Sequence, residues 1–269
     1  MGKNATLHSM EKSKQVVMLM AHLGCNIASV EQKYQRLSRE LPTEMYDVFL
    51  LFNVNRRSEL PPSLRKEYVC AYDLEDINAL GYTPICKTLL PGSCHFPVLK
   101  FFIDHPQYSH YWFIEYDVEF TATWDVLMDA YAAHPADFIA SHIFYYEEDM
   151  SWSWWRRCNH VGYPLGQCLR AFHPICRYSH AALDYIHHYQ LAGYAAHSEL
   201  LIPTCLYNAH FQLLDMGGEG SFVEEGGKER FYIYNEQIKT MRYRPVFNES
   251  ESQLFSLEAK LFHPVKKYA

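Results

Sequence analysis

Hydrophobic positions along this chain fall into short continuous runs, and the segments between the runs mix polar and apolar residues at helical spacing. Residues 15–22 (QVVMLMAH) and 46–53 (YDVFLLFN) have the pattern of strands that are buried on both faces. The segment between them, 27–40, has polar residues along one face and predicts an amphipathic helix. The other elements predicted before residue 136 are strands at 67–72 and 111–120 and helices at 96–105 and 123–133.

The second half of the chain has a looser pattern. We predict strands at 137–146 and 167–175 and helices at 179–193 and 199–214, with a Trp-rich loop after the first of these strands. Strands that alternate with helices predict an α/β fold with a mostly parallel central sheet and helices on both faces. A chain of 269 residues without internal repeats or a clear linker is expected to form a single domain.

Three acids follow one another at every second position in the run 111–120 (YWFIEYDVEF). If this run is one strand, Glu115, Asp117 and Glu119 project to the same side, where like charges repel unless a cation lies between them. A solvent-exposed strand with a hydrated acidic face is the other interpretation. The continuous apolar run before the acids favours a divalent metal, since open α/β sheets bind ligands at the carboxyl ends of buried strands.

The composition of the chain argues against several classes of partner and site. The formal net charge of -7 and the absence of clustered Lys and Arg argue against nucleic acid as a partner. The eight cysteines form no CxxC pair, so we expect reduced thiols rather than disulfides or a zinc site. The polar N-terminus is followed by an apolar stretch too short for a membrane span, and we therefore expect a cytoplasmic protein.

With these elements in this order, the triplet Glu115-Tyr116-Asp117 resembles the DxD-type motif of metal-dependent glycosyltransferases of the GT-A fold. The resemblance implies a single GT-A-like domain that uses Mn²⁺ or Mg²⁺ and a nucleotide-sugar donor. Asp117 and Glu115 would bind the metal, together with a late histidine, His263. An ordinary buried or surface histidine is the alternative for His263, and Glu119 could compete with Glu115 as a ligand.

The same resemblance divides the chain and assigns further residues. It implies a flexible N-terminus at 1–14, a nucleotide-binding half at 15–135 and an acceptor-side half at 136–269. Its implied site residues are Glu199 as the catalytic base, His22, Asp73 and Lys266 on the nucleotide side, and Trp154, Trp155 and Arg156 on the acceptor side.

Other interpretations of these residues stay open. Glu199 could be an ordinary first-turn acid of a helix, and the Trp-rich loop could be a lid or a packing segment. The acceptor would be a glycan or a glycolipid, and peripheral association with a membrane is compatible with the latter. The rival classes are a metal-dependent phosphohydrolase or nucleotidyltransferase and a carbohydrate-binding protein without enzymatic activity. The sequence leaves open the donor sugar and its nucleotide, the acceptor, the linkage, the stereochemistry and the oligomeric state.

Overall fold

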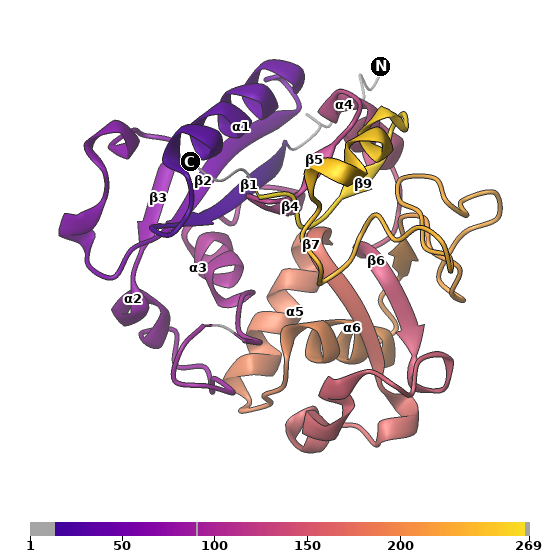
Figure 1. Cartoon of the computed structure of the whole chain (residues 1–269). Helices are drawn as coiled ribbons and strands as arrows, with labels where there is room; N and C mark the ends of the chain where they lie inside the picture. Colours follow the sequence, from indigo (N-terminus) through magenta and orange to yellow (C-terminus); the bar gives the residue numbers. More distant parts are fainter. Residues whose placement is uncertain (1–13, 90, 267–269) are drawn as a thin grey trace, which may run out of the picture.

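The computed structural model describes residues 14–89 and 91–266 of the chain. The N-terminal segment predicted at 1–14 therefore lies outside the described residues apart from Lys14. One seven-stranded sheet forms the centre of the domain, with the strand order β3-β2-β1-β4-β7-β6-β8 (Figure 1). Its strands are β1 (Gln15–His22), β2 (Tyr46–Asn53), β3 (Val69–Tyr72), β4 (His110–Glu115), β6 (Phe138–Tyr145), β7 (Leu169–Ser179) and β8 (Leu213–Asp215).

The sheet is mostly parallel, as the sequence predicts. Strand β1 runs parallel to β2 and β4, β2 is parallel to β3, and β6 is parallel to β8. Strand β7 is antiparallel to both of its neighbours, β4 and β6. Since β1 to β4 point the same way, their carboxyl ends meet at one edge of the sheet, where open α/β sheets bind ligands.

Helices cover both faces of the sheet (Figure 1). One hydrophobic cluster packs α1 and α4 against the sheet, and a second cluster on the opposite face contains α2, α3, α5 and α6. The helices are α1 (Ile27–Glu40), α2 (Leu74–Asn78), α3 (Phe96–Asp104), α4 (Trp124–Tyr131), α5 (His180–Leu191) and α6 (Ser198–Asn208). The fold is thus a single α/β domain with a core on each side of the sheet.

Strand β4 shows why the sheet has two cores. Trp112 and Ile114 belong to the cluster under α1 and α4, whereas Tyr111 and Phe113 belong to the cluster on the other face. All four are buried, because successive side chains of a strand point to opposite faces and helices cover both. The apolar run at the start of 111–120 is therefore explained by position in the middle of the sheet.

The strand predicted over 111–120 is wrong beyond Glu115. The chain turns at Tyr116 and Asp117, with the Val118 N–H donating to the Glu115 carbonyl at 3.1 Å. It then forms the short strand β5 (Glu119–Phe120), which pairs antiparallel with β9 (Leu261–Phe262) outside the main sheet. The three acids consequently do not share one strand face.

Two other local expectations are also corrected, and α2, which Asp73 caps directly after β3, is a helix that the sequence pattern did not predict. The helix predicted at 199–214 ends at Asn208, and β8 follows it. Part of the Trp-rich loop, Ser153–His160, forms two short 3-10 segments separated by a kink at Arg157.

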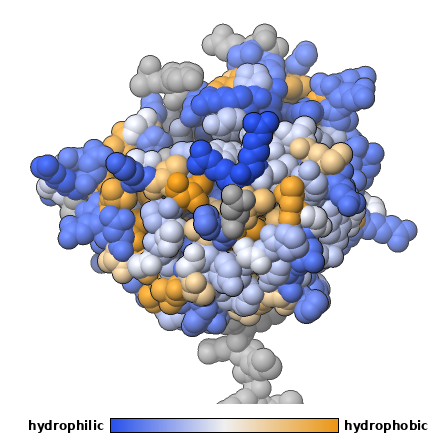
Figure 2. All heavy atoms as spheres, turned by 90° about the horizontal axis from the view of Figure 1, so that it is seen from below, coloured by the Kyte–Doolittle hydropathy of each residue, from blue (hydrophilic) through white to orange (hydrophobic). Residues whose placement is uncertain are grey.

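The face of the molecule drawn in Figure 2 is mixed in polarity, with hydrophobic residues in separate groups among hydrophilic ones. Among the helices within residues 14–89 and 91–266, none has the length and apolar character of a membrane span. None of the eight cysteines, all of which lie in the described ranges, forms a disulfide.

Candidate active site and metal centre

The chain places one acidic residue at the end of β4 and another in the turn that follows it. Glu115 is the last residue of β4 and is in register with Met20 of β1, so it lies at the carboxyl edge of the parallel strands. The Tyr116 N–H donates to the Met20 carbonyl at 3.0 Å, and the Asp117 carbonyl accepts from the Val265 N–H at 2.8 Å. The turn is thus held to the central sheet on one side and to the C-terminal segment on the other.

His263 comes from the C-terminal segment and faces both acids. Its Nε2 atom is 3.4 Å from Glu115 Oε2 and 3.5 Å from Asp117 Oδ1. Its Nδ1 atom lies 2.8 Å from the Arg242 carbonyl oxygen, which can only accept, so we assign the proton to Nδ1. This hydrogen bond fixes the ring and turns the other nitrogen toward the carboxylates, as is usual for a metal-ligating histidine.

Glu115, Asp117 and His263, which we call the acid–histidine cluster, can hold one metal ion. Each offers one ligand atom, and these three atoms lie within 4.8 Å of one another. Asp117 is 5% exposed, and its Oδ1 atom has no hydrogen-bond partner within the described part of the chain. A buried carboxylate oxygen of this kind requires a positively charged or hydrogen-bonding partner, which a bound metal ion would supply and which, without metal, is the protonated His263 ring 3.5 Å away. Two carboxylates and an imidazole suit Mn²⁺, and the carboxylates also suit Mg²⁺.

The protonation states of the cluster follow from its burial and its charges. Burial by itself lowers the pKa of His263, but Asp117 and Glu115 outweigh it and raise the pKa to about 9. Burial alone would raise the pKa of Asp117, and His263, Lys266 and Lys33 together bring it below its ordinary value. In the absence of a metal, His263 is therefore a cation that supplies positive charge beside the two carboxylates.

Two of the residues expected on the nucleotide side lie beside this cluster. The Lys266 Nζ atom is 3.7 Å from Asp117 Oδ2. His22, at the end of β1, packs edge-on against Tyr116 with ring centroids 5.4 Å apart. Burial lowers the pKa of His22, Lys266 lowers it further, and Asp117 and Glu115 oppose both effects. A cationic side chain and an imidazole thus flank the carboxylates at the carboxyl ends of β1 and β4.

Asp73 has a different local role. Its carboxylate accepts from the backbone N–H groups of Glu75 and Asp76 at 3.0 and 3.1 Å and caps α2. Among the described residues, no hydrogen bond or ion pair joins Asp73 to the acid–histidine cluster.

Glu119 belongs to an ion-pair group instead of the cluster. Its carboxylate pairs with Lys33 Nζ at 3.2 Å and with Arg36 Nη1 at 3.7 Å, both on α1. The break in the strand after Glu115 sends Glu119 toward this helix. Glu119 therefore does not take the place of Glu115 facing His263.

Glu199 lies in the first turn of α6, and about a fifth of its side chain (19%) is exposed. Burial raises the pKa of this carboxyl to about 8; Arg170 and His263 oppose the increase and Glu115 adds to it. Because Glu115 and His263 both affect this pKa, Glu199 is electrostatically coupled to the cluster. A carboxyl with this pKa can gain or lose a proton near neutral pH.

The two tryptophans expected on the acceptor side have different environments. Trp154 is partly exposed and packs against His197 with ring centroids 4.4 Å apart. Trp155 is 4% exposed, donates its indole N–H to the Asp149 carbonyl and packs in the core, so its ring is not offered to an acceptor. Arg156 is exposed. Of the three residues expected on the acceptor side, Trp154 is the one that presents a partly exposed aromatic ring beside α6.

Two further residues lie at the site without having been expected there. The Cys94 Sγ atom is 3.2 Å from Ser198 Oγ, and burial followed by Glu115 raises the pKa of this thiol to about 12. Arg170 is 8% exposed and forms an ion pair with Asp149 at 2.7 Å. Its positive charge lowers the pKa of Glu199 and so opposes the effect of burial. Neither residue has a sequence signal, because each reaches the site through packing between distant segments.

Comparison with known proteins gives little beyond this geometry. No known family model and no curated protein matches the sequence. Similar solved structures include the mannosyltransferase Ktr4p from S. cerevisiae in complex with GDP and the same protein without it, with TM-scores of 0.34 and 0.33 and 13% sequence identity. Each similarity covers 72% of this chain and 66% of the other, just under two thirds of that protein's length. Because these TM-scores are low, the fold is assigned from its topology and the site from its geometry.

Proposed function

We propose that this protein is a metal-dependent glycosyltransferase that takes its sugar from a nucleotide-sugar donor. One observation carries the proposal: Glu115, Asp117 and His263 lie at the carboxyl ends of the parallel strands, and a buried Asp117 oxygen has no hydrogen-bond partner among the described residues. A metal that binds this cluster would neutralise the negative charge of a leaving diphosphate. The fold places the cluster where open α/β sheets bind nucleotides.

The residues around the cluster have distinct parts in this mechanism. Asp117, Glu115 and His263 would hold Mn²⁺ or Mg²⁺, with the His263 ring oriented by the Arg242 carbonyl. Lys266 would add positive charge beside the diphosphate, and His22 would flank the donor. These assignments make residues 15–135 the nucleotide-binding half, to which the C-terminal segment contributes His263 and Lys266.

The acceptor would lie over α6. Glu199 would accept the proton of the acceptor hydroxyl, since a carboxylate with a pKa of about 8 is a stronger base than an ordinary glutamate. Trp154 presents a partly exposed indole on which a sugar ring can stack. The acceptor half at 136–269 would thus combine one base and one aromatic surface.

A two-metal phosphohydrolase fits this site less well. Such enzymes use several acids and histidines to hold two ions, whereas residues 14–89 and 91–266 contain one group of three such ligands. A metal-free carbohydrate-binding protein would leave the buried cluster without a role.

The test is a screen of nucleoside-diphosphate sugars for thermal stabilisation with and without Mn²⁺. We expect at least one donor to raise the melting temperature only when metal is present, and Asp117→Asn to abolish that increase. Stabilisation that needs no metal, or that survives this substitution, would contradict the proposal. A phosphate ester that stabilises more than every nucleotide sugar would favour the phosphohydrolase.

A further inference from the structure

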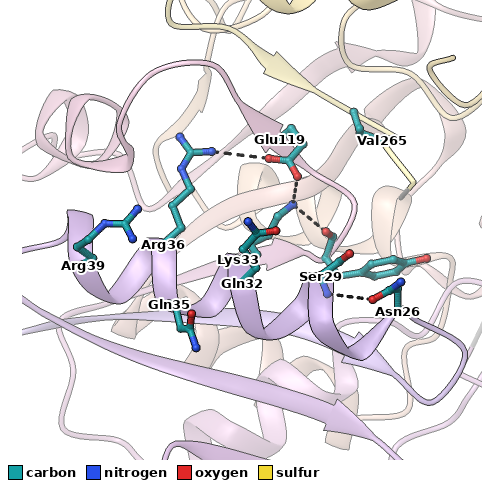
Figure 3. Close-up of a pocket in the computed structure, with 10 residues that line it drawn as sticks. Asn26, Ser29, Gln32, Lys33, Gln35, Arg36, Arg39, Glu119 and Val265 are labelled. Atoms are coloured by element: carbon teal, nitrogen blue, oxygen red, sulfur yellow. Dashed lines mark hydrogen bonds and ion pairs between the residues drawn. The ribbon is translucent and has the colours of Figure 1, made fainter. Parts of the chain in front are cut away.

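A lysine on the buried side of α1 is joined to the loop that carries Asp117. The Lys33 side chain is 6% exposed, and its Nζ atom donates to the Tyr116 carbonyl at 2.7 Å and to the Val118 carbonyl. It also pairs with Glu119 Oε1 at 3.2 Å. Figure 3 shows Lys33 and Arg36 reaching from α1 toward Glu119.

The geometry of these contacts matches an ammonium group. A lysine ammonium has three N–H donors, and the loop offers it two carbonyl oxygens and one carboxylate oxygen. The two carbonyls belong to the residues immediately before and after Asp117. The backbone on both sides of this metal ligand is therefore tied to one buried cation.

The position of Lys33 is unusual for its residue type. It lies between Val30 and Leu37 on the buried face of α1, where an apolar residue would be expected. Buried lysines are rare unless they are paired, and Lys33 is paired with atoms of the 116–119 loop. Lys33 also lowers the pKa of Asp117.

Arg36 provides a natural comparison one turn further along α1. It also approaches Glu119, at 3.7 Å, but its guanidinium donates to the carbonyls of Phe120 and Ala122 at 3.1 and 2.5 Å. Arg36 and Lys33 line the same pocket of ≈ 310 Å³ along α1. The lining of this pocket includes Tyr116 but none of the three residues of the acid–histidine cluster. Lys33 thus holds the loop beside Asp117, and Arg36 holds the chain after β5.

We propose that Lys33 is a positioning residue for the metal site: its ammonium fixes the 116–119 loop so that Asp117 faces Glu115 and His263. This inference rests on the proposed function, because it assumes that the acid–histidine cluster binds a divalent cation. Without the ammonium, the Tyr116 and Val118 carbonyls lose a shared donor, and the loop loses one of the contacts that hold Asp117 in position, beside its backbone hydrogen bonds to Met20 and Val265.

The test compares Mn²⁺ affinity, measured by electron paramagnetic resonance of the free ion, in Lys33→Met and Arg36→Met. Both variants lose a cation that contacts Glu119, and we expect both to have lower melting temperatures. Only Lys33→Met is expected to bind Mn²⁺ more weakly, by at least about tenfold, as for other groups that orient metal ligands. Equal affinity in Lys33→Met and the wild type, or an equal loss in both variants, would overturn the proposal.

If Lys33→Met does not fold, a second variant tests the same role. Lys33→Arg keeps the positive charge but replaces the compact ammonium with a larger planar group, so we expect a folded protein with several-fold weaker Mn²⁺ binding. Wild-type affinity in this variant would overturn the positioning role. A wild-type protein that binds no Mn²⁺ would overturn both this inference and the proposed function, whereas normal affinity in the Lys33 variants overturns only the inference.

Discussion

The imidazole of His263 faces the buried carboxylate of Asp117 across 3.5 Å, although the two residues lie in segments far apart in the sequence. The pairing of β5 with β9 brings these segments together, because Glu119 is in register with Phe262, the residue before His263. The metal site proposed for this protein therefore depends on the C-terminal segment folding back over the turn after β4.

Substitution of Asp117 tests the metal site directly. We expect Asp117→Asn to weaken Mn²⁺ binding by at least about 100-fold, because it removes an anionic ligand from a buried position. Isothermal titration with Mn²⁺ measures the affinity. Glu119→Gln is the matched control, since its carboxylate pairs with Lys33 and Arg36 instead of facing His263. A comparable loss in both variants would argue against Asp117 as a ligand.

Metal affinity is expected to depend on pH through His263. The pKa of this imidazole without metal is about 9, so a proton must leave before Nε2 can bind a cation. Between pH 6 and 8 the apparent affinity for Mn²⁺ should rise about tenfold per pH unit. His263→Gln should bind more weakly and lose most of this slope. A wild-type affinity that is constant over this range would show that metal binding releases no proton from His263.

The metal-free protein should become less stable as the pH rises. His263 has a folded-state pKa of about 9 against an ordinary 6.5, so its stabilising contribution is complete below pH 6.5 and is lost as the pH rises through 9. The shift corresponds to roughly 3 kcal/mol in the free energy of unfolding. Denaturant unfolding at a series of pH values measures this decline.

His263→Gln separates this contribution from that of Glu199. The pKa of Glu199 is also raised, from 4.5 to about 8, so the stability linked to its neutral form is lost as the pH rises through 8. We expect His263→Gln to keep only the part of the decline that belongs to Glu199. An unchanged decline above pH 8 in this variant would exclude His263 as its source.

Glu199 can be tested as a base without disturbing the donor. We expect Glu199→Gln to reduce turnover by about 10²- to 10⁴-fold and to leave Mn²⁺ and nucleotide affinity within a few-fold. In the wild type, kcat/KM should rise with pH toward 8, since the carboxyl must be ionised to accept a proton. Steady-state kinetics with the donor identified by the screen measures both effects. Full turnover in the variant would assign Glu199 a structural role at the start of α6.

Trp154 and Trp155 should respond differently to the same substitution. Trp154→Ala is expected to raise the KM for the acceptor several-fold with little change in stability, because its indole is partly exposed. Trp155→Ala should lower the free energy of unfolding by about 3–5 kcal/mol, as for other large-to-small substitutions in a core. Acceptor kinetics and denaturant unfolding of both variants measure the contrast. A larger loss of stability in Trp154→Ala would reverse these roles.

Some parts of this protein follow from the sequence alone. Strands β1 and β2 and helix α1 have the bounds that their hydrophobic patterns predict. A strand that is buried on both faces has a continuous apolar run, and a helix that is buried on one face has apolar residues at helical spacing, so both patterns can be recognised in the sequence. The mostly parallel sheet follows from the alternation of strands and helices. The acids Glu115 and Asp117 could be located at the end of a buried strand for the same local reason.

Only the tertiary structure determines which of the acids lie in one cluster. It ended β4 at Glu115, directed Glu119 to Lys33 and placed His263 beside Asp117. It also buried Trp155 and coupled Glu199 to the cluster. These outcomes depend on contacts between segments that are distant in sequence, and residue order records such contacts only weakly, because many partners are compatible with the same local pattern.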